Sequence, residues 1–142
     1  MLINLLLAAN VCGVTWDPVR VLPVPMRTKL QGAQVVSPCR VASLPPAVQD
    51  LLAQTAGQKK VGMADPGKEW NAGCLQREGF ANRQLVVAAK AGLNWVVHYR
   101  EGGFALVEMA AVFEEDGGTF RQVWLGQCVL EHGQRKCGHA DP

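Results

Sequence analysis

The chain has 142 residues, of which 49% are hydrophobic and 18% are charged, and its formal net charge is +2. This length is typical of a single domain with one hydrophobic core, and the composition excludes a disordered polyelectrolyte. The basic residues are scattered rather than gathered in a stripe, so the sequence does not predict a nucleic-acid-binding protein.

Residues 1–13 are mostly apolar and contain no lysine or arginine. The segment is too short for a membrane-spanning helix, which needs about 20 apolar residues, so no transmembrane span is predicted. Its length suits the apolar region of a secretory signal, although such a signal usually opens with a basic residue. We therefore expect residues 1–13 to be either a signal-like segment or a structural N-terminal element, and residues 14–142 to form a single domain.

The cysteine count favours the first of these readings. Five cysteines are many for a cytosolic domain, and cleavage after Gly13 would remove Cys12 and leave an even set. An even set of cysteines suits disulfide formation in an exported protein. The sequence thus predicts a periplasmic or secreted protein.

Six of the eight prolines lie in residues 14–46. Each removes a backbone donor and favours an extended conformation in the preceding residue, so this region is predicted to be an extended arm without a helix. Residues 34–36 suit a short strand. A helix is then predicted over residues 45–56, because Ser43 can cap it, prolines are tolerated in its first turn, and apolar residues follow at helical spacing.

Residues 62–82 are rich in glycine, asparagine, aspartate and proline, and are predicted to be a long connection. A connection of this length in a small domain is usually functional or pinned in place. Trp70 either fills the core from this loop or, with its neighbours Lys68 and Glu69, anchors a protein-binding surface.

From residue 83 onward the pattern changes to the period of two that is typical of strands. Four strands are predicted, with glycine-containing turns between them, over residues 83–89, 94–100, 104–114 and 119–129. The expected fold class is α+β, with one main helix packed on a four-stranded antiparallel β-meander that follows the proline-rich extended arm.

The helix is expected to cover an apolar face of this meander that includes Trp95 and, from the fourth strand, Phe120 and Trp124. The opposite face is expected to be exposed to water, since it carries the polar side chains of Asn94, His98, Arg100, Glu108 and Glu114. We therefore add His98 and Arg100 to the candidate binding residues.

Two interpretations of the cysteines are open. The short separation of Cys128 and Cys137 favours a disulfide between them, and Cys39 is then predicted to pair with Cys74. The weaker alternative is a zinc site, because two cysteines and two histidines near the C-terminus are zinc ligand types. Their spacing matches no usual zinc motif, and the sequence predicts no cofactor. The four candidate ligands are Cys128, His132, Cys137 and His139.

No nucleophile and base stand at a recognisable catalytic spacing, and no Gly-x-Ser-x-Gly motif occurs. The sequence therefore predicts no catalytic residues. We expect a non-catalytic exported module that binds a protein partner, of the inhibitor or envelope-adaptor type. Two alternatives stay open, namely a small Cys/His-dependent enzyme or zinc-binding module, and a structural subunit of an assembly.

Overall fold

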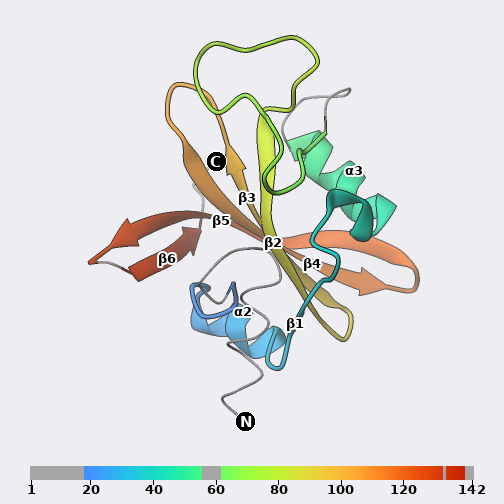
Figure 1. Cartoon of the computed structure of the whole chain (residues 1–142). Helices are drawn as coiled ribbons and strands as arrows, with labels where there is room; N and C mark the ends of the chain where they lie inside the picture. The colour runs from blue at the N-terminus through green and yellow to red at the C-terminus, as the bar shows by residue number, and fades with distance from the viewer. Residues whose placement is uncertain (1–17, 56–61, 133, 140–142) are drawn as a thin grey trace.

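The computed structural model describes residues 18–55, 62–132 and 134–139, so the predicted N-terminal segment 1–13 lies outside the described residues. The main element is a six-stranded antiparallel sheet in which the strands are ordered as they follow in the chain. Figure 1 shows that this sheet is strongly curled, in the manner of a half-barrel.

The described elements comprise six strands, two α-helices and one 3-10 turn. In chain order they are α2 (Val24–Lys29), β1 (Gln34–Val35), the 3-10 turn Val41–Ser43, α3 (Pro46–Thr55), β2 (Arg83–Ala91), β3 (Asn94–Glu101), β4 (Val107–Asp116), β5 (Thr119–Glu131) and β6 (Gln134–His139).

The predicted four-stranded meander with a main helix is wrong, because the sheet has a further strand at each edge. On one edge, β1 pairs with β2. On the other edge, β5 is 13 residues long and β6 pairs back along it. The chain reverses next to His132, whose φ of 50° lies in the left-handed region used by tight turns. The residues of β6 are mostly polar, so hydrophobic periodicity does not reveal this strand.

The proline-rich segment 14–46 was predicted to contain no helix, and this is also wrong. The helix α2 forms with Pro23 as its N-cap residue and Pro25 in its first turn. Backbone donors of a first turn have no partner within the helix, so proline costs nothing there. The helix α3 agrees within a residue at each end with the helix predicted over 45–56.

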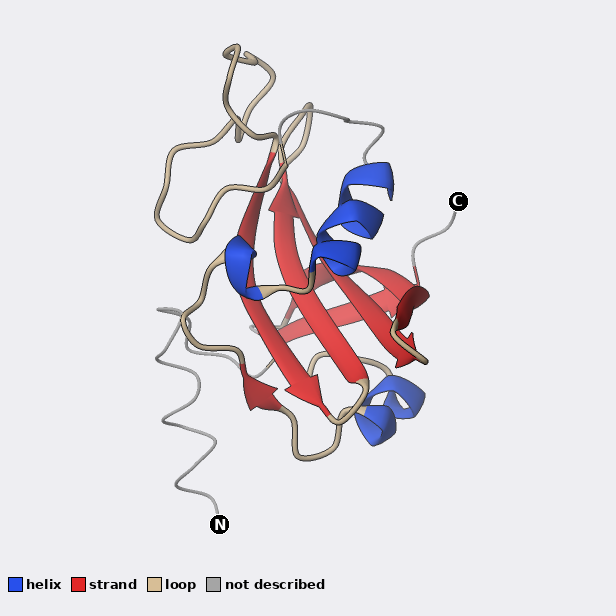
Figure 2. Ribbon diagram, turned by 90° about the vertical axis from the view of Figure 1, so that its right-hand side faces the viewer, coloured by secondary structure: helices blue, strands red, loops and turns tan. Residues whose placement is uncertain are grey.

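Both faces of the sheet are covered. The side chains of α3 pack on one face, which we call the α3 face. Residues 18–33, which include α2 and which we call the arm, pack on the other face, the arm face. Figure 2 shows the two helices at different ends of the long strands. The buried members of the α3 face are Leu44, Val48, Leu52, Leu85, Ala88, Trp95, Val97, Tyr99, Ala111 and Phe113. Those of the arm face are Leu22, Leu30, Ala89, Val96, Ala110, Val112, Cys128 and Cys137.

The prediction that one face of the sheet is exposed to water is therefore wrong. The arm contributes the buried side chains of Leu22 and Leu30, and the strands offer Val96, Ala110 and Val112 beneath them. Burying this apolar surface on both sides stabilises the fold by roughly 25 cal/mol per Å². His98 lies on this covered face and is only 1% exposed.

A β-bulge in β5 explains a further correction. Val112 pairs with Trp124 while Phe113 pairs with Gln122, so Val123 is an extra residue in β5. One extra residue reverses the alternation of side chains along a strand. As a result, Phe120 packs on the α3 face and the half-buried Trp124 packs on the arm face, although they were predicted to share a face.

Candidate functional site

Two features of the structure are candidates for function, and the first is a surface made by two loops. The long loop 62–82 and the β3–β4 connection 102–106 lie together at the end of the sheet where β2 begins, as Figure 1 shows. We call this surface the loop end. The thiol of Cys74 lies 3.4 Å from the carbonyl oxygen of Gly103, so the two loops are in contact.

The long loop is held by the buried side chain of Asn71. Its amide nitrogen donates to the carbonyl oxygens of Arg77 and Phe80, at 3.0 and 3.1 Å, and to the side-chain oxygen of Asn82 at 2.9 Å. Its amide oxygen accepts the backbone N–H of Arg77 at 2.9 Å. A Cβ at Gly102 would collide with the carbonyl of Asn71, so the two loops pack backbone against backbone. The loop end is thus an ordered platform.

Three large apolar side chains of the loop end face solvent. Phe104 is 100% exposed, Leu75 is 91% exposed and Leu106 is 57% exposed. Leu75 follows Cys74 and Phe104 follows Gly103, so Leu75 and Phe104 each adjoin a residue of the contact that joins the two loops. We call this set the apolar tip. Sequence reasoning missed it, because the alternating pattern placed Phe104 and Leu106 inside a strand that begins only at Val107.

The predicted binding residues of the long loop lie beside this tip along the chain. Lys68 and Glu69 are exposed, and Glu69 forms an ion pair with Arg77 at 3.7 Å. Trp70 is half-buried, and it is not among the described side chains that pack on either core cluster. The guanidinium of Arg77 in turn lies 4.0 Å from the ring centre of Phe80. Charged groups of both signs therefore accompany the apolar tip.

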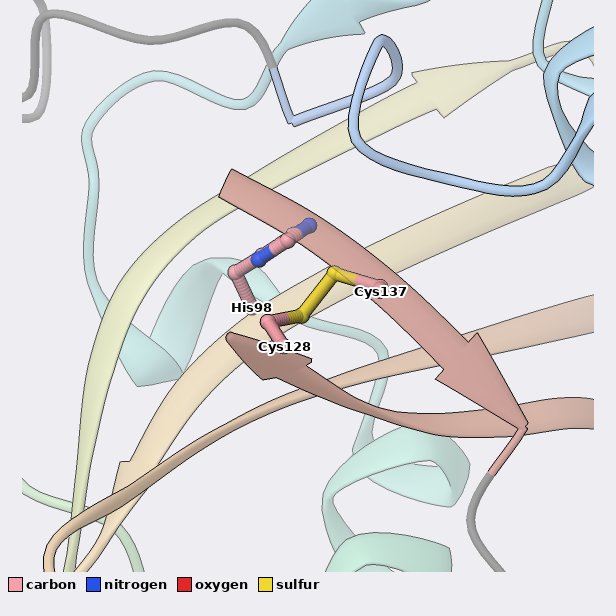
Figure 3. A group of neighbouring side chains, drawn as sticks. All are labelled: His98, Cys128 and Cys137. Atoms are coloured by element: carbon pink, nitrogen blue, oxygen red, sulfur yellow. A yellow bond between two sulfur atoms is a disulfide. The ribbon is translucent and has the colours of Figure 1, made fainter. Parts of the chain in front are cut away.

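The second feature is buried. Cys128 and Cys137 are directly opposite one another on β5 and β6 and form a disulfide, as predicted. His98 reaches them from β3, as Figure 3 shows. One ligand atom from each of the three residues lies within 4.8 Å of the others. We call these three residues the histidine–disulfide cluster.

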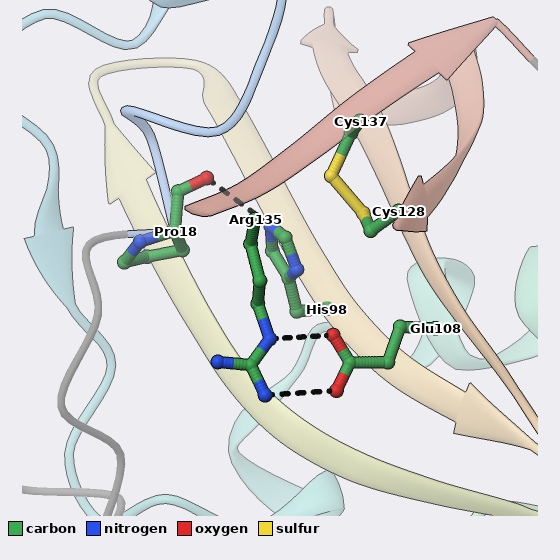
Figure 4. The surroundings of a disulfide bond; sticks show 6 residues. All are labelled: Pro18, His98, Glu108, Cys128, Arg135 and Cys137. Carbon is green, nitrogen blue, oxygen red and sulfur yellow. Dashed lines mark hydrogen bonds and ion pairs between the residues drawn. A yellow bond between two sulfur atoms is a disulfide. The ribbon is translucent and has the colours of Figure 1, made fainter. Parts of the chain in front are cut away.

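The imidazole of His98 is fixed by the arm. Its Nε2 lies 3.1 Å from the carbonyl oxygen of Pro18 (Figure 4). A carbonyl can only accept, so Nε2 carries the proton and Nδ1 carries the lone pair. Burial lowers the pKa of His98 from 6.5 to about 3, against the opposing effect of the Pro18 hydrogen bond and with a further contribution from the charge of Arg135. His98 is therefore neutral at physiological pH.

An ion-pair network borders the histidine–disulfide cluster. Arg135 of β6 donates two hydrogen bonds to Glu108, at 2.9 and 3.3 Å, and Figure 4 shows this bidentate pair. Arg100 approaches the same carboxylate at 3.5 Å. Arg100, a predicted binding residue, is thus half-buried and engaged within the fold, and His98 is not on the surface at all.

The predicted Cys39–Cys74 disulfide does not form. Cys74 is a free, exposed thiol on the loop end, whereas Cys39 belongs to another disulfide. Cys39 packs on the α3 face, with its sulfur 3.8 Å from the carbonyl oxygen of Val86. The two residues were paired by elimination from the cysteine count, and the count carries no information on where the loop places Cys74.

The four-ligand zinc alternative is not assembled among the described residues. Cys128 and Cys137 are joined, and His132 is exposed in the turn between β5 and β6. The side chain of His139 lies outside the described part of the chain. The histidine that does accompany the two sulfurs is His98, some 30 residues away in sequence, which no local spacing could indicate.

Comparison with protein-family models, with curated proteins and with solved structures finds no match to this chain. Among the residues that the structure describes, no helix is both long and apolar enough to cross a membrane.

Proposed function

We propose that this protein is a non-catalytic exported domain that binds a protein partner through the loop end. The observation that supports the proposal is the apolar tip, in which Phe104 is fully exposed. Exposed apolar side chains are common singly, but a group of them on an ordered platform is typical of an interaction site.

The expected partner is a protein surface with an apolar patch bordered by charges of both signs. Burial of one large apolar side chain contributes roughly 1.5–3 kcal/mol, so the three side chains of the apolar tip could supply most of a micromolar affinity. The accompanying charges of Lys68, Glu69 and Arg77 would orient the partner more than they would strengthen the complex.

Export is part of the proposal, and the Cys128–Cys137 disulfide supports it. Disulfides between neighbouring strands persist in oxidising compartments and are rare in the cytosol.

The exposed thiol of Cys74 provides a direct test. We would attach a photoactivatable cross-linker to Cys74 of the whole chain and expose it to the exported proteins of the source organism. We expect a specific adduct with another protein, which Phe104→Ser abolishes. The control is Leu93→Ser, because Leu93 is also exposed, at 58%, but lies in the β2–β3 turn at the other end of these strands.

Both substitutions are on the surface and should leave the melting temperature nearly unchanged. An adduct that survives Phe104→Ser, or one that Leu93→Ser abolishes equally, would contradict a binding site at the apolar tip. An adduct containing only two copies of this chain would replace the proposed partner by self-association.

A further inference from the structure

The histidine–disulfide cluster has the composition of a metal site once its disulfide is opened. We propose that, after reduction by a dithiol, Cys128, Cys137 and His98 bind a thiophilic d¹⁰ metal ion, Zn²⁺ or Cu⁺, so that the cluster is a redox-gated metal site. This inference is independent of the loop end and of the partner proposed for it.

The three side chains already lie close to a binding geometry. They come from β3, β5 and β6, and their ligand atoms lie within 4.8 Å of one another. Ligand atoms around one Zn²⁺ are separated by roughly 3.5–4 Å, given metal–ligand distances of about 2.0–2.3 Å. To bind one ion, the freed sulfurs must separate and the imidazole must approach them, and the separation of at most 4.8 Å between the ligand atoms keeps these movements small.

The histidine is oriented as metal-binding histidines are. Such residues usually donate the second ring N–H to a carboxylate or a backbone carbonyl, which fixes the ring and leaves the other nitrogen for the metal. Here Nε2 of His98 donates to the carbonyl oxygen of Pro18, and the lone pair is on Nδ1. The same part of the arm also holds β6, since the carbonyl oxygen of Val21 accepts the backbone N–H of Cys137 at 2.8 Å.

The surroundings suit a soft metal ion. The neighbouring buried side chains are apolar and include Leu22 and Val96, so water is largely excluded. Two thiolates neutralise Zn²⁺, and with Cu⁺ they leave one negative charge. A neutral imidazole and two thiolates are ligands that both ions accept.

Opening the disulfide takes two electrons and two protons, which the dithiol supplies. One thiolate of the reductant attacks a sulfur of the disulfide, and its second thiolate displaces the mixed disulfide, so that the reductant leaves in its own disulfide form. Cys128 and Cys137 are then thiols, and metal binding releases their two protons.

The test uses the whole chain in its reduced and oxidised forms, titrated separately with Zn²⁺ and with Cu⁺ against a chelating competitor. We expect the reduced protein to bind one of these ions in equimolar amount, and the oxidised protein to bind it at least about tenfold more weakly. His98→Gln should weaken binding by about tenfold or more, whereas the matched changes His132→Asn and His139→Asn should leave it unchanged.

A second measurement needs no variant. In the reduced wild-type protein, the bound metal should protect Cys128 and Cys137 from alkylation while the exposed thiol of Cys74 stays reactive. Absence of this protection would overturn the proposal, as would a His98→Gln protein that folds and binds as tightly as the wild type. Loss of binding in His132→Asn or His139→Asn would assign the metal to the C-terminal residues instead.

Discussion

Replacement of His98 by glutamine should remove a large part of the pH dependence of folding. The side chain is buried and its pKa is lowered from 6.5 to about 3, chiefly by burial. Between about pH 6.5 and about pH 3, His98 is therefore protonated in the unfolded chain but not in the folded protein. The free energy of unfolding must then fall as the pH drops from about 6.5 to about 3, and it changes no further through this group at lower pH.

The magnitude follows from the two pKa values. Each unit of difference corresponds to about 1.4 kcal/mol, so the full loss between them is about 5 kcal/mol. Between about pH 7.5 and about pH 5 the loss is about 2 kcal/mol, because only the lowest 1.5 units of that interval lie below the ordinary pKa. Glutamine does not titrate and can still donate to the carbonyl oxygen of Pro18, so His98→Gln should lose this part of the dependence.

The assay is urea denaturation of the oxidised protein at both pH values. The decrease in the free energy of unfolding should be about 2 kcal/mol smaller in His98→Gln than in the wild type. The carboxylates contribute equally to both proteins, so the comparison isolates the histidine. His132→Asn is the control, because His132 is exposed in a turn with a positive φ that asparagine tolerates, and it should show the wild-type decrease.

Equal decreases in the wild type and in His98→Gln would refute the reasoning, since His98 would then take up its proton in the folded state. A decrease that vanished in His132→Asn would refute it as well.

Two further predictions concern the β5–β6 region. Gly126→Ala should lower the free energy of unfolding by about 1–3 kcal/mol, because a Cβ there would meet the ring of Trp124 and a backbone carbonyl, whereas Gly138→Ala meets nothing and should be near neutral in thermal denaturation. Replacing Cys128 and Cys137 together by alanine should cost about 3 kcal/mol in urea denaturation, since the bridge closes a loop with a sequence separation of 9. Wild-type stability in either Gly126→Ala or the double variant would contradict the corresponding argument.

The sequence by itself determined the elements whose signals are local. The helix α3 could be predicted because the prolines of its first turn and the apolar spacing lie within a dozen residues. Ser43 was expected to cap this helix, which is wrong, because it ends the 3-10 turn Val41–Ser43 and its hydroxyl donates to the carbonyl oxygen of Pro38. The strands β2 to β5 could be predicted because glycine-containing turns separate alternating runs, as at Gly117 and Gly118, where φ is positive. The short separation of Cys128 and Cys137 likewise indicated their disulfide.

What only the tertiary structure decided depends on segments that are distant in sequence. The arm covers the second face of the sheet, and the carbonyl oxygen of Pro18 contacts His98, which lies 80 residues later in the sequence. His98 is therefore buried, although the alternating pattern of the strand predicted that it would be exposed to water. The single extra residue at Val123 changes the face of Trp124 with no mark in composition or spacing. The exposure of Phe104 depends in the same way on how two loops pack, because burial is a property of the folded assembly and not of a short run of residues.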